Sequence, residues 1–123
     1  MISFEDSLVI HGVLIEQFGG ADGIRDESAL KAALSRPHTT FDGKDLYPTA
    51  VDKAAAILQS ILINHPFIDG NKRVGYVFMR LMLMNEGFDI QASEDEKYQF
   101  VIETAEGKLD IDKITSWIKK HIY

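Results

Sequence analysis

The feature that most constrains the fold is a run of apolar residues that follows a polar loop and ends before Gly87. The run consists of Val74, Tyr76, Val77, Phe78, Met79, Leu81, Met82, Leu83 and Met84. On a helix these side chains point in nearly every direction, and a helix that is apolar on all sides belongs in a protein interior. We therefore expect a central, buried helix from about residue 72 to Glu86, with the core built on it and Gly87 closing it.

The rest of the chain also carries helix signals, so the predicted fold class is all-α. Ser3 and Asp26 are expected to cap the first two helices, and Pro48 suits the first turn of the third. Pro66 disfavours helical geometry in the residue before it, so the third helix should end at or just before that residue. Ser93 with Glu96 forms a capping box for the fifth helix. The expected helices besides the central one cover residues 4–18, 27–36, 48–64, 94–107 and 110 to the end.

Length and composition indicate one domain of an ordinary soluble protein. The 123 residues are 46% apolar and 26% charged, which suffices for a single core. A formal charge of -6 argues against direct nucleic-acid binding, which normally needs a basic surface. The chain has no cysteine and no membrane-spanning run, and its first residues turn acidic where a signal peptide would be basic, so a cytoplasmic location without membrane contact is expected.

A loop with several polar groups separates the two most apolar predicted helices. It reads His65-Pro66-Phe67-Ile68-Asp69-Gly70-Asn71-Lys72-Arg73. We expect Asn71 to cap the central helix and to leave the amides of residues 70–73 free for an anion. Lys72 and Arg73 add two positive charges, so a polyphosphate is the expected ligand. Asp69 would oppose that ligand unless it held Mg²⁺, and His65 can act as a general base.

Each part of this loop also has a purely structural interpretation. A histidine before a proline often only ends a helix, and Asp69-Gly70-Asn71 alone is a turn with a cap. Lys72-Arg73 alone is a solvated pair. A simple turn gains nothing from five such groups side by side, which favours a functional site. The spacing is not that of a Walker A loop, because the segment follows a helix and lacks the Gly-Lys-Ser/Thr ending.

The nine residues resemble the signature of the Fic family, His-Pro-Phe-x-Asp/Asn-Gly-Asn-Gly-Arg-x-x-Arg, in its Doc (death-on-curing) variant with lysine at the second glycine. Further similarity lies in Gly19-Gly20, Gly23-Ile24-Arg25-Asp26, residues 30–37, Tyr47-Pro48 and Asn85-Glu86-Gly87. The resemblance therefore covers nearly the whole chain. It implies one Fic/Doc domain over residues 1–123, an all-α helical bundle with a short irregular flap around residues 37–47.

The resemblance also implies catalytic roles. His65 would be the base that deprotonates a hydroxyl of a protein target, and Asp69 would be the Mg²⁺ ligand. Asn71 and the amides next to it, that of Gly70 included, would form the anion hole. Arg73 would complete the catalytic group by holding the phosphates of ATP.

Two departures from the general Fic pattern bear on the reaction. Lys72 occupies a glycine position, where it fills space for one phosphate while attracting another, and Tyr76 replaces the second arginine. Both disfavour adenylyl transfer. They favour the Doc reaction, in which ATP donates its γ-phosphate and Lys72 joins Arg73 in binding the nucleotide.

Four functions remain as hypotheses. The first is a toxin of a type II toxin–antitoxin system, a kinase-like enzyme that inhibits translation by phosphorylating a translation factor such as elongation factor Tu. The others are an adenylyltransferase of the same fold, a ribonuclease toxin and an inactive Fic-fold binding module. The Arg–His spacing of HEPN ribonucleases is absent, and an inactive module would be expected to have lost His65 or Asp69. The implied partner is a short Phd-like antitoxin whose C-terminal segment binds as a helix in a groove.

The sequence also suggests roles for several residues outside the loop. Phe41 and Tyr47 are candidates for contacting a partner, on the assumption that the flap lies beside the site. Arg80 is expected to pair with an acid at the helix edge rather than to reach the anion site. Trp117 is expected in the core. The remaining histidines, His11, His38 and His121, show no spacing typical of metal ligands.

Overall fold

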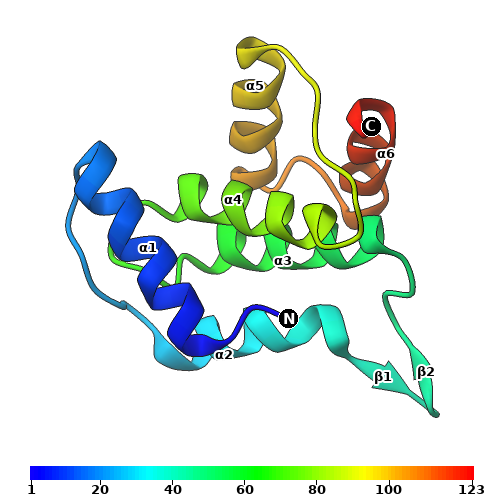
Figure 1. The fold of residues 1–123 in the computed structure, drawn as a ribbon, viewed down its shortest axis with the longest axis horizontal. Coiled ribbons are helices and arrows are strands. Elements are labelled where there is room, and N and C mark those ends of the chain that lie inside the picture. The colour runs from blue at the N-terminus through cyan, green and yellow to red at the C-terminus, as the bar shows by residue number, and fades with distance from the viewer.

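The computed structural model describes residues 1–123 as a helical protein with six α-helices, one short 3-10 helix and one two-stranded hairpin, which confirms the all-α fold class (Figure 1). The elements are α1 (Phe4–Phe18), α2 (Glu27–Ser35), η1 (Arg36–His38), β1 (Thr40–Phe41), β2 (Lys44–Asp45), α3 (Ala50–Asn64), α4 (Asn71–Met84), α5 (Glu94–Ala105) and α6 (Ile111–His121). No helix is both long and apolar enough to cross a bilayer.

The helices form three layers, with α3 and α4 side by side in the middle (Figure 1). One face of this pair packs on α5 and α6 through Leu58 and Leu62, which share a buried cluster with Phe100 and Ile114. The opposite face packs on α1 and α2 around a second cluster that includes Leu30, Ile57, Phe67 and Phe78. Because α3 buries side chains at spacings of three and four residues toward both clusters, it lies between two cores.

The central position that the sequence assigned to α4 alone is shared with α3, which is the more buried helix. Eight of the residues of α3 are buried, compared with six of those of α4. Close packing of the two helices depends on Gly75, where an added Cβ would lie 3.1 Å from Leu62 Cδ2 and 3.2 Å from Ile61 Cγ2. The other apolar positions of α4 are only half-buried or, at Met84, exposed. Tyr76 and Val77 line a groove shared with α5, and Leu81 and Met82 line a groove shared with α1.

Several helix boundaries differ by one or two residues from the sequence prediction, and those at the two ends of the polar loop's neighbouring helices matter most. Thr49 caps α3 through a capping box with Asp52, so Pro48 precedes the cap instead of lying in the first turn. Gly70, at φ +75°, is the cap residue of α4, and Asn71 is its first helical residue. The C-terminal end of α4 comes at Met84, two residues before the predicted Glu86.

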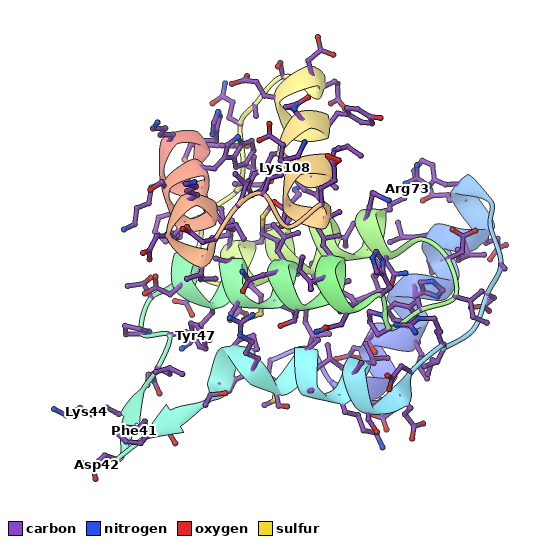
Figure 2. All side chains as sticks on the ribbon, turned by 180° about the vertical axis from the view of Figure 1, so that it is seen from behind. Phe41, Asp42, Lys44, Tyr47, Arg73 and Lys108 are labelled. Carbon is purple, nitrogen blue, oxygen red and sulfur yellow. The ribbon has the colours of Figure 1, made fainter.

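The predicted flap is a short antiparallel hairpin in which Thr40 pairs with Asp45 and Phe41 with Lys44. Asp42 and Gly43 both have positive φ, as a two-residue type I′ turn requires. The hairpin leads into the start of α3, whereas the polar loop follows the end of α3, about 20 Å away along a 15-residue helix. Figure 2 shows Phe41 and Arg73 at opposite ends of the molecule.

The assumption that the flap lies beside the site was therefore wrong. Its two aromatic residues also differ in exposure. The Phe41 side chain is 77% exposed, while Tyr47 is half-buried and its hydroxyl accepts a hydrogen bond from Arg36 Nε at 2.9 Å. Arg36 also donates to Ser60 Oγ at 3.0 Å, which ties the base of the hairpin to α3.

The C-terminal end of α4 is tied to the end of the chain. Arg80 makes two hydrogen bonds to the carboxylate of Asp89, at 2.9 and 2.7 Å, as expected for a pair at the helix edge. This interaction holds the pKa of Asp89 at about 2, below its ordinary value. Asp89 and Tyr123 exchange backbone hydrogen bonds of 3.0 and 3.1 Å. Trp117 is half-buried, stacked between Phe100 and His121.

Candidate functional site

The polar loop between α3 and α4, residues 65–70, is called the motif loop below. It begins where α3 ends, because His65 adopts the left-handed conformation with φ +47° and ψ +60°. This turns the chain out of the helix ahead of Pro66, which disfavours right-handed helical geometry in the residue before it. The His65 side chain is exposed, and its ring faces a groove.

A segment far away in sequence, residues 20–26, holds the motif loop from one side. Ile24 and Phe67 form an isolated β-bridge, with Ile68 N–H donating to the Gly23 carbonyl at 3.0 Å. The side chain of Arg25 donates to the carbonyl of His65 at 2.6 Å and to that of Asn64. These carbonyls end α3 and lack partners within the helix. Arg25 thereby stabilises the turn that presents His65.

Asn71 closes the motif loop from the other side. Its Oδ1 accepts from Phe67 N–H and its Nδ2 donates to the Phe67 carbonyl, both at 3.0 Å. The residue is buried, at 9% exposure. The predicted capping role of Asn71 is therefore wrong, because both polar atoms of its side chain hold the loop. Its contribution to an anion hole rests on its backbone N–H.

The carboxylate of Asp69 is oriented by two backbone amides. Oδ1 accepts from Gly70 N–H at 2.8 Å, and Oδ2 accepts from Ala21 N–H at 3.3 Å. Gly20 packs directly on this group, since a Cβ there would lie 2.7 Å from Oδ2. The carbonyl of Asp69 accepts a hydrogen bond of 2.7 Å from Nε2 of His11, a buried residue of α1.

The first turn of α4 offers an anion site. The N–H groups of residues 71–73 have no partner inside the helix, and no side chain caps them. Lys72 and Arg73 extend from the same turn and are exposed. The guanidinium of Arg73 lies 4.1 Å from the ring centroid of Phe18, a cation–π contact that holds it between α1 and α4. Free amides, the helix dipole and two cations together can bind a polyphosphate.

A groove of about 660 Å³ runs along this turn, large enough for a small-molecule ligand. The motif loop and the start of α4 form one wall, where His65, Asp69, Lys72 and Arg73 come together as the sequence predicted. The opposite wall consists of residues of α5, which sequence reasoning did not connect with the site. They are Glu94, Lys97, Tyr98, Val101 and Ile102.

Tyr76, at the position of the second Fic arginine, also lines this groove. Its hydroxyl is buried and makes no hydrogen bond, and burial raises its pKa to about 12. The tyrosine therefore stays neutral at physiological pH. It offers no charge to a phosphate, unlike the arginine of the general pattern.

The site can accommodate one Mg²⁺ ion only if the ligand supplies further oxygens. Nowhere do three or more histidine or acidic side chains gather as a metal site, so the side chains around Asp69 do not form a complete coordination shell by themselves. Each carboxylate oxygen can accept more than the single hydrogen bond that it receives here. One carboxylate with phosphate oxygens and water is a common Mg²⁺ environment, so the residues fit this ion.

The residues that sequence reasoning missed act on the backbone of the motif loop. Arg25 entered the sequence analysis only as part of a segment that resembles the family, without a role of its own. His11 was noted only as a histidine without the spacing of a metal ligand. No local pattern connects either residue with a loop about 40 or 58 positions away. The Gly19-Gly20 and Gly23-Ile24-Arg25-Asp26 segments of the family resemblance were the only available signal.

The fold and the site define a class of protein. It is a helical protein whose two central helices are joined by a loop that carries a histidine and a carboxylate, and the second of these helices begins with two cationic residues. The chain matches the family model described as Fic/DOC family over residues 1–83, a match that ends within α4. It is also 39% identical over 105 residues to the protein named Toxin Doc of Mycolicibacterium smegmatis, covering 80% of this chain and 78% of that one. The chain belongs to the Fic/Doc family.

Proposed function

We propose that the protein is a toxin that transfers the γ-phosphate of ATP to a hydroxyl group of a protein target. The observation that carries the proposal is the start of α4, where free amides, Lys72 and Arg73 face the groove that His65 and Asp69 also line. The name of the related Toxin Doc supports the toxin function. The proposed target is a translation factor, with elongation factor Tu as the first candidate from the family resemblance.

In the proposed reaction the target hydroxyl gives its proton to His65 while its oxygen attacks the γ-phosphorus. The bond from that phosphorus to the bridging oxygen of the β-phosphate breaks, and ADP leaves. The exposed imidazole of His65 can approach a protein substrate from solvent. Free amides of residues 71–73 with Lys72 and Arg73 stabilise the charge on the phosphate oxygens.

Mg²⁺ bound by Asp69 would neutralise phosphate charge when present. Hydrogen bonds from the Gly70 and Ala21 amides fix the orientation of the Asp69 carboxylate in the site. Because proton removal, charge neutralisation and alignment contribute separately, loss of His65 should leave nucleotide binding nearly intact.

The side chains at positions 72 and 76 favour phosphoryl transfer over adenylyl transfer. Lys72 adds bulk and charge where the general Fic motif leaves open space, and the neutral Tyr76 removes one phosphate contact. A nucleotide bound with its γ-phosphate at the start of α4 would be compatible with the lysine at position 72 and with the missing arginine at position 76. Adenylyl transfer requires the α-phosphate in the attacked position and remains the alternative.

The test is incubation of the purified protein with Mg²⁺, purified elongation factor Tu and ATP labelled in either the γ- or the α-phosphate. Labelling of the target from γ-labelled ATP alone supports the proposal, and labelling from α-labelled ATP alone would replace it with adenylyl transfer. His65→Ala is the inactive control and should bind ATP about as tightly as the parent. A lysate in place of elongation factor Tu separates a wrong target from a wrong reaction.

We further propose that a short antitoxin with a helical C-terminal segment binds the protein in a second groove. A cavity of about 700 Å³ lies between α1, the start of α3 and the end of α4. Its lining is mainly apolar and includes Met1, Ile2, Val9, Ile10, Leu81, Met82 and Phe88. Val9 is 66% exposed and Phe88 is 42% exposed, so these side chains are available to the apolar face of a helix.

Co-expression with a small protein encoded beside the toxin should relieve growth arrest and give a stoichiometric complex. Val9→Asp should weaken that rescue because it places a charge in the apolar groove. Val13→Asp is the matched control, since Val13 is an exposed valine on the same helix outside the groove. Equal rescue of both variants would contradict this binding site.

A further inference from the structure

We propose that His11 of α1 is a positioning residue, which orients the carboxylate of Asp69 by fixing the peptide group between Asp69 and Gly70. The inference rests on the proposed function, in which Asp69 is the acidic group of the phosphate site. His11 lies outside the family signature of residues 65–73 and contacts the motif loop from α1. It is 1% exposed, so its contacts are within the protein and not with solvent.

The argument starts from the two ends of one planar peptide group. Its carbonyl oxygen, on Asp69, accepts from Nε2 of His11 at 2.7 Å. Its N–H, on Gly70, donates to Oδ1 of the Asp69 side chain at 2.8 Å. The C=O and N–H of a trans peptide point in opposite directions and turn together. The hydrogen bond from His11 therefore also fixes the direction of the Gly70 N–H, which donates to the Asp69 carboxylate.

This peptide needs an external constraint because it precedes a glycine. Gly70 has φ +75° and ψ +15°, a conformation that glycine adopts as readily as those of negative φ. Rotation of the peptide would remove the Gly70 amide from the carboxylate. The remaining donor, Ala21 N–H at 3.3 Å, is the longer of the two bonds and contacts only Oδ2. Without His11 the carboxylate would keep this single contact.

The surroundings of His11 restrict its ring to one orientation. The ring stacks on Phe67, with centroids 3.9 Å apart and planes 7° from parallel. Nδ1, on the opposite edge, lies 3.4 Å from Oδ1 of Asp22. Nε2 must carry a hydrogen, because its partner is a carbonyl that can only accept. A phenylalanine would keep the stacking and lose this donor, whereas a glutamine would keep a donor near the Nε2 position and lose the ring.

These two substitutions give opposite results for the two roles that His11 could have. If the Nε2 donor positions the loop, His11→Gln should retain γ-phosphate transfer within about threefold, and His11→Phe should lose about 10- to 100-fold, the range for a group that orients a ligand-binding side chain. If only stacking matters, His11→Phe should be the active variant. His11→Asn, whose amide reaches only the Nδ1 position, should behave like His11→Phe. Thermal unfolding of each variant identifies any that fails to fold.

A second measurement does not depend on the reaction. Amide hydrogen exchange of Gly70, followed by NMR on the full chain, reports its bond to the carboxylate. Exchange should accelerate in His11→Phe and His11→Asn and stay near the parent rate in His11→Gln. Equal exchange in all variants, or acceleration in His11→Gln alone, would overturn the inference. Absence of phosphate transfer by the parent would refute the proposed function. The relative exchange rates of Gly70 in the three variants would still test the role of His11.

Discussion

Replacement of Asn71 by alanine should destabilise the whole domain through two hydrogen bonds at the centre of the motif loop. The carboxamide accepts from Phe67 N–H and donates to the Phe67 carbonyl, both at 3.0 Å. Phe67 is completely buried, and neither of these backbone groups has another partner. A buried polar group left without its partner costs about 1–3 kcal/mol. Since water can partly reach the vacated space, we expect a loss of about 2–4 kcal/mol in total.

Urea unfolding followed by circular dichroism measures this loss. With a slope typical of small domains, the midpoint should fall by about 1–2 M. Asn71→Asp keeps an acceptor for Phe67 N–H but buries a carboxylate oxygen against the Phe67 carbonyl, so this variant should also be clearly less stable than the parent. Asn85→Ala is the control, because Asn85 is exposed and its side chain makes no hydrogen bond. A midpoint for Asn71→Ala equal to that of the Asn85→Ala control would refute the role assigned to the carboxamide.

Three further predictions concern charge. Asp69→Asn should give low transfer activity that no longer responds to added Mg²⁺, measured as rate against Mg²⁺ concentration; a parent-like response would mean that the ion binds elsewhere. Lys72→Gly should shift the product from phosphate toward adenosine monophosphate, or abolish transfer because Tyr76 still lacks the arginine charge, and mass spectrometry of the target distinguishes these results. The pKa of Asp89, lowered from 3.8 to about 2 by Arg80, adds stability above about pH 4 that disappears as pH falls toward 2. Relative to Asp89→Asn, the parent should lose about 1–2 kcal/mol over that interval in unfolding experiments, and parallel pH profiles would contradict the pair's contribution.

Local sequence signals determined most of the secondary structure and the identity of the motif. Caps such as Ser3 and Ser93 contact amides three residues away, so their effect is readable within a few positions. The same holds for the Asp42-Gly43 turn, whose positive φ values follow from residue type. His65, Asp69, Lys72 and Arg73 lie within nine residues, so their assembly on one groove was predictable from the loop between two apolar helices.

The tertiary structure decided which groups hold that loop and which surfaces face it. Asn71 is a common capping residue, yet its buried carboxamide binds Phe67 because Gly70, in the left-handed conformation, takes the cap position. His11 contacts the loop across 58 positions, and α5 supplies the far wall of the groove from beyond the motif. The flap lies at the other end of α3 because helix length separates its two ends in space. Such contacts depend on how helices pack, a property of the whole chain that no short segment specifies.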